Sequence, residues 1–457
     1  MSLTTPTAAG EVLFLTVEPL RERLAGPAIR ALELARAVAR SGAADRVALV
    51  SLAGCARTDG LVGLSAAGPD LPARAAAAAA VVVQGDVLNQ LPWLAGLDVP
   101  VVVDVYDPFH LEQLEQTRGL PDAERLTTVR DTLRALNGQL ARADLVLCAS
   151  SRQRALWLGQ LAALGRLNPL TYDPAPDLAD LVAVVPFGTA PPPPVAPGRR
   201  DALRAVVPEL ADDDVLLVWG GGLYPWFDAE TLLTAMARLA GPLPGVKLLF
   251  LGTRHPMQPD VESPTVAGLR AQAAANGTLD RTVFFHEGWV PYDERHGWLA
   301  AGDVGVSTHH LHLETEFSYR TRVVDYLAAG LPVLTTDGDA LADLVRATGA
   351  GVVVPPGDVD ALAAAISGLA GDPAGRRELS TRASAAAGEL DWDLVAAPLV
   401  AFCRAPRRAP DLVAPAEVRA LLAVAPGSPL RRVRAAVAEG GPRLLAARLA
   451  RRLRPGR

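Results

Sequence analysis

A dense cluster of charged residues lies between Glu314 and Thr336, in the run ETEFSYRTRVVDYLAAGLPVLTT. Its carboxylates and arginines fall within twelve residues, and a small-residue helix end and an apolar strand pattern follow at once. Aspartate and arginine rarely face a core element unless they are paired, bind a ligand or catalyse a reaction. Carboxylates accept hydrogen bonds from hydroxyl groups, and arginine binds phosphate oxygens bidentately. The run therefore predicts a site with this chemistry, built from Glu314, Glu316, Arg320, Arg322 and Asp325.

The elements that must position these side chains alternate between apolar strands and helices. Strand patterns in the first half cover 11–17, 47–52, 80–84, 99–105, 144–149 and 181–185, and those in the second half cover 215–219, 246–251, 282–286, 304–307, 332–335 and 351–354. Helical patterns separate most of them, including one from about Pro27 and others at 228–240, 293–300, 320–329 and 340–348. Continuous apolar strands between helices predict parallel sheets covered on both faces. The fold class is therefore α/β, with two doubly wound, Rossmann-like domains.

A proline-rich stretch separates the two domains. Four consecutive prolines, 191–194, exclude a helix or a central strand there. The sequence predicts a first domain over 1–190, a linker over 191–200, a second domain over 201–385 and a basic tail over 404–457. Ligands of such sheets bind beyond the carboxyl ends of the strands, so we expect the site in a central cleft between the domains.

Composition excludes several classes of protein. The 457 residues are 50% hydrophobic, and the three cysteines show no CxxC spacing, so neither a disulfide framework nor a thiolate zinc site is indicated. No segment reaches the ~20 apolar residues of a membrane helix and the amino terminus lacks a secretory pattern, so we expect a cytoplasmic protein. Lysine occurs once, at Lys247, so a phosphate site must rely on arginine.

The tail is a separate electrostatic unit. Residues 404–457 carry a net charge of +10, whereas the first 403 residues carry −16. Its last part is compatible with a basic helix that contacts an anionic membrane, and equally with a solvated tail.

Three loops of the second half are expected to face the cleft. Glycines 220–222 follow a strand and precede a helix that Asp228 can cap, so their N–H groups are available to an anion, although many such turns are merely tight. Gly252 and Arg254 come at the end of the next strand. Arg254 either binds a phosphate or is an ordinary surface charge. Trp289 and Val290, in HEGWV, lie where a nucleobase can stack, or Trp289 is an ordinary half-buried tryptophan.

The combined motifs resemble retaining GT-B glycosyltransferases of the family-4 type, also described as glycosyl transferases group 1. The resemblance covers most of residues 11–403. Its motifs are LAAGLPVLTT after Asp325, VAVVPFGTA at the domain boundary, HEGWV, and TGAGVVVPPGDVDALAAAI. The region of Trp392 is also similar to the family's helix that crosses back to the first domain, and this helix is predicted at 386–403.

The resemblance implies a GT-B fold and a function. The protein would transfer a sugar from a nucleotide-diphosphate donor to a hydroxyl group of a glycan, lipid-linked or small-molecule acceptor, with retention of configuration and without a metal or other cofactor. Such chemistry is typical of bacterial glycan biosynthesis. Asp325 stands where the family has the second glutamate of its motif, so it is expected to bind the ribose.

Two departures leave roles open. The family motif has seven residues between its two glutamates, and with Asp325 as the second the first position is Phe317. Either Glu314 or Glu316 would therefore hold the donor sugar, with Glu316 as the catalytic candidate. The family's Arg and Lys after the first strand of this domain are absent, and Arg320 and Arg322 are the candidate replacements. The alternative for Arg322 is an i, i+3 pair with Asp325.

The acceptor side is expected after VVVDVYDPFHLE. Asp107 or His110 is the candidate that binds or deprotonates the acceptor hydroxyl, with His110 the better base near neutral pH, unless Asp107 only caps a helix. Residues 212–214 are three aspartates at the far end of a strand and are expected to be solvated. Two other functions remain open: a sugar-nucleotide epimerase of related fold, and a GT-B scaffold or binding subunit without turnover. The nucleotide base, the sugar, the acceptor and the oligomeric state do not follow from the sequence.

Overall fold

The first domain is built on a seven-stranded parallel sheet with the order β3-β2-β1-β4-β5-β6-β7. The structure is a computed structural model that describes residues 10–190, 199–208, 210–258 and 260–422. The strands are β1 (Glu11–Thr16), β2 (Arg46–Ser51), β3 (Gly63–Ala66), β4 (Ala80–Gln84), β5 (Val101–Asp104), β6 (Leu145–Cys148) and β7 (Val182–Val184). Six of them confirm the predicted strands. The sequence pattern missed β3, because this edge strand, GLSA, is partly exposed and lacks an apolar run.

The second domain contains a six-stranded parallel sheet with the order β10-β9-β8-β11-β12-β13. Its strands confirm all six predictions: β8 (Val215–Gly222), β9 (Val246–Gly252), β10 (Val283–Phe285), β11 (Val304–Ser307), β12 (Val333–Thr336) and β13 (Gly351–Val354). Glycines 220–222 were expected in a loop and instead extend β8, where Gly222 pairs with Gly252 across a register shift. Glycine is required at 252, because a Cβ there would lie 2.4 Å from the carbonyl oxygen of Gly221.

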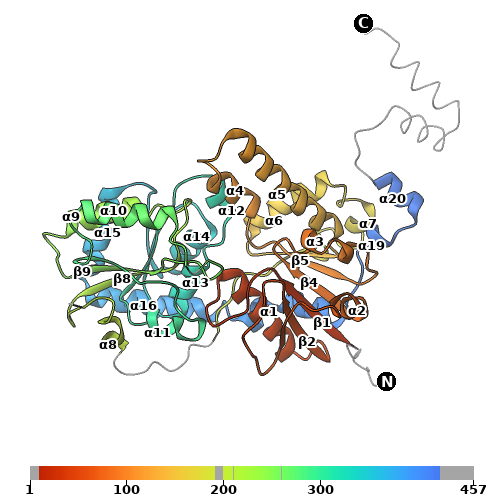
Figure 1. Cartoon of the computed structure of the whole chain (residues 1–457), viewed down its shortest axis with the longest axis horizontal. Helices are drawn as coiled ribbons and strands as arrows, with labels where there is room; N and C mark the ends of the chain where they lie inside the picture. Colours follow the sequence, from red (N-terminus) through yellow and green to blue (C-terminus); the bar gives the residue numbers. More distant parts are fainter. Residues whose placement is uncertain (1–9, 191–198, 209, 259, 423–457) are drawn as a thin grey trace, which may run out of the picture.

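Helices cover the sheets, and the two domains lie side by side as separate lobes (Figure 1). The first domain contains α1 (Gly26–Arg40), α2 (Leu71–Ala77), α3 (Val87–Gln90), α4 (Phe109–Gln116), α5 (Asp122–Arg142), α6 (Ser151–Ala163) and α7 (Pro169–Tyr172). The second contains α8 (Arg199–Leu203), α9 (Ala229–Leu239), α10 (Pro264–Ala275), α11 (Arg295–Leu299), α12 (Leu313–Phe317), α13 (Thr321–Ala328), α14 (Ala340–Thr348), α15 (Val359–Gly371) and α16 (Pro373–Gly388). In the described part of the chain, no helix combines the length and hydropathy needed to cross a membrane.

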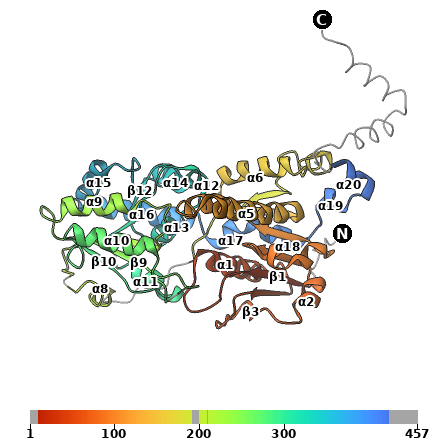
Figure 2. The same cartoon turned by 45° about the horizontal axis from the view of Figure 1, so that its top comes forward.

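The chain returns to the first domain after α16, through α17 (Trp392–Val395) and α18 (Ala397–Arg404), which both contact α1 (Figure 2). The predicted crossing helix at 386–403 is thus two short helices preceded by the end of α16. Trp392 fixes the crossing, because its N–H donates to the carbonyl of Thr189 at 3.0 Å and its ring packs on Phe187.

Part of the expected tail packs on the first domain. The helices α19 (Pro410–Val413) and α20 (Ala416–Leu422) follow α18, and Asp411 forms a buried ion pair with Arg166 at 2.6 Å. The predicted basic helix near the carboxyl terminus and the prolines of the linker lie outside the described residues, while the linker's last residues, 199–200, begin α8.

Candidate functional site

The charged run forms two short helices, α12 and α13, whose charged side chains are largely buried between the domains. Glu314 and Arg320 form a bidentate ion pair, with Nη1–Oε1 and Nη2–Oε2 distances of 2.9 and 2.6 Å. Both side chains are buried, and Arg320 also lies over the ring of Phe227. Glu314 and Arg320 therefore neutralise each other in this structure. Glu316, by contrast, is exposed to solvent.

Arg322 has a different environment. Its side chain is 7% exposed and lies over the rings of Trp219 and Phe227, at 4.6 and 4.0 Å from their centroids. Nη2 donates to the carbonyl of Gly222 at the end of β8, at 2.8 Å, whereas Nη1 is buried without a partner among the described residues. Burial lowers the pKa of Arg322 to about 10, so the guanidinium remains charged at neutral pH.

The alternative interpretation required an ion pair between Asp325 and Arg322, but the two side chains do not form one. The Asp325 carboxylate instead contacts Arg295 of α11 at 2.9 Å. Burial raises the pKa of Asp325, and the nearby arginines oppose this shift. Asp325 and Arg295 line a cavity of about 590 Å³ between the domains, together with Tyr292 and, from the first domain, Glu33 and Arg36.

Sequence reasoning missed the first-domain wall of this cavity. Arg36 joins the carboxylates of Glu33 and Asp59, and the Tyr292 hydroxyl donates to Glu33 at 2.7 Å. The expected inner face of α1, at Ile29, Leu32, Ala35 and Val38, is buried as predicted. A signal was nonetheless present: charged residues recur every three residues along this helix, at 30, 33 and 36, and the first two are also buried.

The other candidates for donor binding lie at the ends of β8 to β10. Gly221 and Gly222 end β8 beside Gly252 at the end of β9. Arg254 pairs with Glu287 at 3.5 Å and is 39% exposed, as expected for a surface charge.

Trp289 and Val290 follow β10. The Trp289 indole N–H donates to the carbonyl of Leu24 in the first domain at 3.0 Å, and its ring lies against His255. The side chain of Val290 is buried in the core, so only its main-chain groups are available to a ligand.

On the first domain, the structure reverses the expected order of the two candidate bases. His110 is buried against the ring of Trp157, and burial lowers its pKa to about 4. Asp107 is half-buried after β5, and burial together with the charge of Asp104 raises its pKa to about 6. Asp107 is therefore the stronger base near neutral pH. Asp104 itself forms a buried pair with Arg30 at 2.7 Å.

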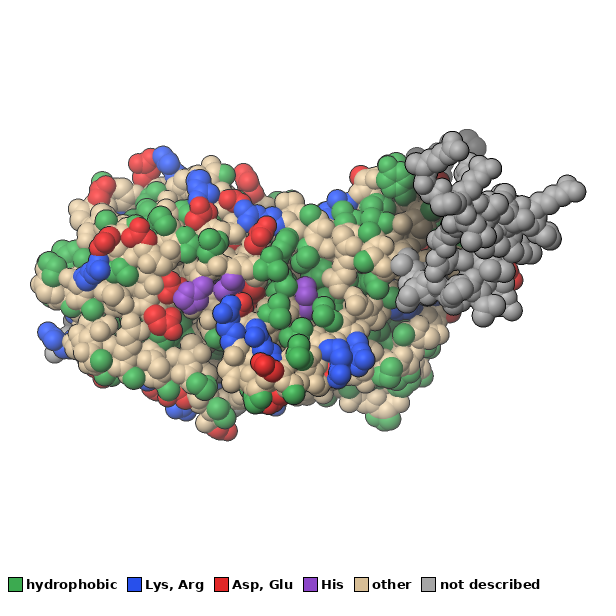
Figure 3. Space-filling model, turned by 90° about the horizontal axis from the view of Figure 1, so that it is seen from above, with side chains coloured by type: hydrophobic (Ala, Val, Ile, Leu, Met, Phe, Trp, Pro, Cys, Tyr) green, Lys and Arg blue, Asp and Glu red, His purple; other side chains and the backbone are tan. Residues whose placement is uncertain are grey.

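Two further carboxylates from the first domain were not predicted. Glu18 follows β1 and Glu112 lies in α4, which packs against α12 of the second domain. Seen from above, acidic, arginine and histidine side chains gather near the middle of the molecule beside a hydrophobic cluster (Figure 3). The position of Glu18 just past a strand end was a usable signal, because the same rule identified Asp107.

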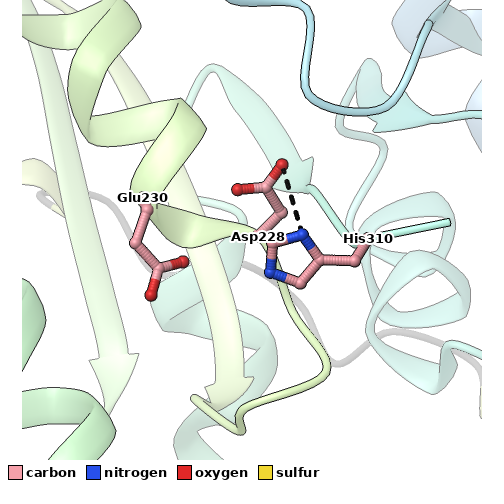
Figure 4. Close-up of side chains that lie close together, drawn as sticks. All are labelled: Asp228, Glu230 and His310. Atoms are coloured by element: carbon pink, nitrogen blue, oxygen red, sulfur yellow. Dashed lines mark ion pairs between the residues drawn. The ribbon is translucent and has the colours of Figure 1, made fainter. Parts of the chain in front are cut away.

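Asp228, Glu230 and His310 also come together (Figure 4). Their potential ligand atoms lie within 4.8 Å of one another, but Glu230 and His310 are exposed. Asp228 has a structural role, since its Oδ1 accepts the N–H of Thr231 and caps α9, as the sequence predicted. The aspartates at 212–214 lie at the opposite end of β8, and the first two are exposed as expected.

Comparisons with known proteins match this architecture. The family model described as Glycosyl transferases group 1 matches residues 214–372. No curated protein sequence matches the chain. The solved sucrose-phosphate synthase from Thermosynechococcus elongatus is similar, with 19% identity, coverage of 86% of this chain and 98% of that chain, and a TM-score of 0.62.

Two other solved structures are similar at 17% identity, and each comparison covers 86% of this chain and 99% of the other. They are Anabaena HepE in complex with UDP and glucose, with a TM-score of 0.61, and WaaG, a glycosyltransferase involved in lipopolysaccharide biosynthesis, with a TM-score of 0.57. At such identities the structural likeness establishes the fold, and the family model identifies the second domain. The chain therefore has the GT-B fold, and its residues 214–372 match the glycosyl transferases group 1 family model.

Proposed function

We propose that the protein transfers a sugar from a nucleotide-diphosphate sugar to a hydroxyl acceptor with retention of configuration. The observation that carries the proposal is the buried guanidinium of Arg322, whose Nη1 has no partner among the described residues. Burying a charge without full hydrogen bonding is costly. A diphosphate oxygen supplies the missing acceptor and the opposite charge.

Two helix N-termini support a diphosphate at this place. A Cβ on Gly26, the first residue of α1, would lie 3.7 Å from the hydroxyl oxygen of Thr321, the first residue of α13. The two N-termini thus come together from opposite domains. Arg322 directly follows Thr321 at this place. Helix N-termini attract anions through their free N–H groups and their dipoles.

The nucleoside would occupy the cavity beside Asp325. A carboxylate there accepts hydrogen bonds from both ribose hydroxyls, and Tyr292 lines the same cavity. The solved HepE structures contain UDP with glucose and UDP-glucose, which supports a nucleotide-sugar donor for this chain as well. The base and the sugar stay open.

In the proposed reaction, the bond between C1 of the donor sugar and the β-phosphate oxygen breaks. The acceptor oxygen forms a new bond to C1 on the same face, and its proton passes to Asp107. Arg322 and the two helix N-termini stabilise the charge that develops on the leaving diphosphate. Glu314 or Glu316 would hold hydroxyl groups of the donor sugar.

The test is incubation of the pure protein with a panel of uridine, guanosine and adenosine diphosphate sugars. We expect a thermal shift and slow hydrolysis with at least one donor, and an α-linked product from an α-linked donor once an acceptor is found. Formation of an epimer in place of transfer would establish the epimerase. Stabilisation without turnover, even with acceptors, would establish the binding subunit, and the absence of any stabilisation would overturn the donor site.

Matched arginine variants locate the diphosphate. Arg322→Ala should weaken binding of the free nucleoside diphosphate by about tenfold or more, because a charge-assisted hydrogen bond is lost. Arg238→Ala is the control, because Arg238 is half-exposed and pairs with Asp360 on the outside of the second domain. Equal affinity of the two variants would reject the role of Arg322.

We further propose that the reaction needs no metal ion. Turnover should survive treatment with EDTA, and a loss that Mg²⁺ or Mn²⁺ restores would direct attention to Asp228, Glu230 and His310.

We also propose a cytoplasmic protein of bacterial glycan biosynthesis, with peripheral contact between its basic tail and an anionic membrane. The tail proposal rests on its charge alone. Sedimentation with phosphatidylglycerol vesicles should fall when residues 423–457 are removed, and unchanged sedimentation would reject it.

A further inference from the structure

Three carboxyl groups of the first domain converge where it faces the second. Glu18 comes two residues after β1 and Asp107 three residues after β5, and both strands border β4 in the sheet. A hydrogen bond from Thr16 to Gln84 joins the ends of β1 and β4 at this edge. Glu112 extends the group from α4, the helix that packs against α12. None of the three carboxylates is within ion-pair distance of a basic residue in the described part of the chain.

Asp107 interacts with both Glu18 and Glu112. Burial and the charge of Asp107 raise the pKa of Glu18 to about 7. Burial raises the pKa of Glu112 well above its usual range, and the charges of Asp107 and Glu314 add to this effect. The neighbouring arginines offset the repulsion only in part, because Arg30 is paired with Asp104 and Arg320 with Glu314.

Tyr224 connects this group to the proposed diphosphate site. Its ring stacks on Trp226, with the centroids 4.8 Å apart. The pKa of Tyr224 is raised, first by burial and then by Glu112 and Glu18, while Arg322 acts in the opposite direction. Glu112, Glu18 and Arg322 therefore all lie close enough to Tyr224 to act on its hydroxyl. Arg322 is 93% buried, since 7% of its side chain is exposed, and its Nη1 has no partner among the described residues.

A ligand next to the leaving diphosphate must therefore satisfy several carboxyl groups at once. Carboxyl oxygens accept hydrogen bonds from hydroxyl groups, and a protonated carboxyl also donates one. A lone alcohol at the end of an alkyl chain can pair with only one of the three groups and would leave the others desolvated and unpaired. Adjacent hydroxyl groups on one ring can pair with all of them.

We propose that Glu18, Asp107 and Glu112 form the acceptor subsite and that they select an acceptor whose reacting hydroxyl belongs to a sugar ring. The inference rests on the proposed transferase function and names its acceptor class. In it, Asp107 contacts the reacting hydroxyl, while Glu18 and Glu112 hold the neighbouring ones.

The experiment measures release of nucleoside diphosphate from the donor that gives the largest thermal shift. The acceptors are the methyl glycosides of glucose, galactose, mannose and N-acetylglucosamine, with 1-octanol as the simple alcohol. We expect at least one glycoside to raise the rate above that of donor hydrolysis and octanol to leave it unchanged. A preference for octanol, or equal use of both, would overturn the proposal.

Variants then test the residues. Glu18→Gln and Glu112→Gln should raise the acceptor KM by about tenfold, because an amide cannot reproduce the hydrogen bonds of the carboxyl group at both of its oxygen positions, while the donor Kd stays within about twofold. Glu115→Gln is the matched control on the same helix, since Glu115 pairs with Arg118. An unchanged acceptor KM in both variants would overturn the proposal.

Two readouts separate this inference from the proposed function. Donor binding by the wild type fails only if the transferase function itself is wrong, and the donor Kd of each variant also reports that it is folded. If no glycoside is turned over, saturation-transfer NMR with the same four glycosides replaces the rate. Glycoside binding to the wild type that is lost in Glu18→Gln would support the subsite. No glycoside binding to the wild type, or binding that the variant keeps, would overturn the proposal.

Discussion

Removal of Glu314 should destabilise the protein far more than removal of Glu316, although the two glutamates are only two residues apart. Glu314→Ala leaves the buried guanidinium of Arg320 without its bidentate partner. The nearest remaining groups are Thr315 Oγ1 at 3.3 Å and an Asp339 oxygen at 3.9 Å. Breaking a buried ion pair on one side costs about 3–5 kcal/mol, because the other charge stays buried. Glu316→Ala should change the free energy of unfolding by less than about 0.5 kcal/mol, since Glu316 is exposed.

The assay is urea unfolding at pH 7, followed by the fluorescence of the seven tryptophans. Donor affinity of the same variants, measured by calorimetry, then separates the two roles. If Glu316 contacts the donor sugar, Glu316→Ala weakens donor binding at unchanged stability. Equal unfolding midpoints for both alanine variants would refute the role of the buried pair, and wild-type donor affinity in Glu316→Ala would exclude Glu316 from the site.

Three further outcomes are expected. Asp325→Ala should weaken binding of a nucleoside diphosphate by about tenfold in calorimetry, through loss of the ribose contact; an unchanged affinity rejects that role. The pKa of Glu18 is about 7 in the folded protein, against an ordinary 4.5, so the folded state binds the extra proton and loses stability as pH rises between these values. Glu18→Gln should therefore be more stable than the wild type at pH 8 by up to about 3 kcal/mol, but not at pH 4.5, in urea unfolding; a pH-independent difference contradicts the shift. Asp411→Ala should cost about 3–5 kcal/mol in the same assay, because Arg166 stays buried without its partner; a cost below about 1 kcal/mol would show that the pair does not anchor α19.

The strands were predictable because parallel strands covered on both faces leave continuous apolar runs in the sequence. The exception, β3, is partly exposed at the edge of its sheet, where no such run is needed. The glycines at 220–222 were placed in a loop because they follow the apolar run 215–219 and precede a helix pattern. They extend β8 because Gly222 pairs with Gly252 of β9, where the two backbones lie so close that a Cβ on Gly252 would clash with Gly221.

The pairing of the charged residues was not predictable from spacing. Glu314 lies in α12, whereas Arg320 lies in the break between α12 and α13, directly before α13, so the shape of this break sets their register. Asp325 and Arg322 are correctly spaced on one helix, but Asp325 faces α11 while Arg322 faces the end of β8. Spacing describes neighbours on one element, whereas partners on other elements depend on how those elements pack.

The missing Arg and Lys after β8 supported the alternative of a scaffold without turnover. The structure gives the aromatic residues of that region a different meaning. Phe227 lies against the guanidinium of Arg322, and Trp219 of β8 lies on it as well. Aromatic faces stabilise a cation without using its hydrogen-bond donors. Buried Arg30, by contrast, uses all three of its nitrogen atoms in hydrogen bonds to Asp104 and two carbonyl groups. The free Nη1 of Arg322 therefore favours a cation that reaches the end of β8 from α13 and keeps one donor for a ligand.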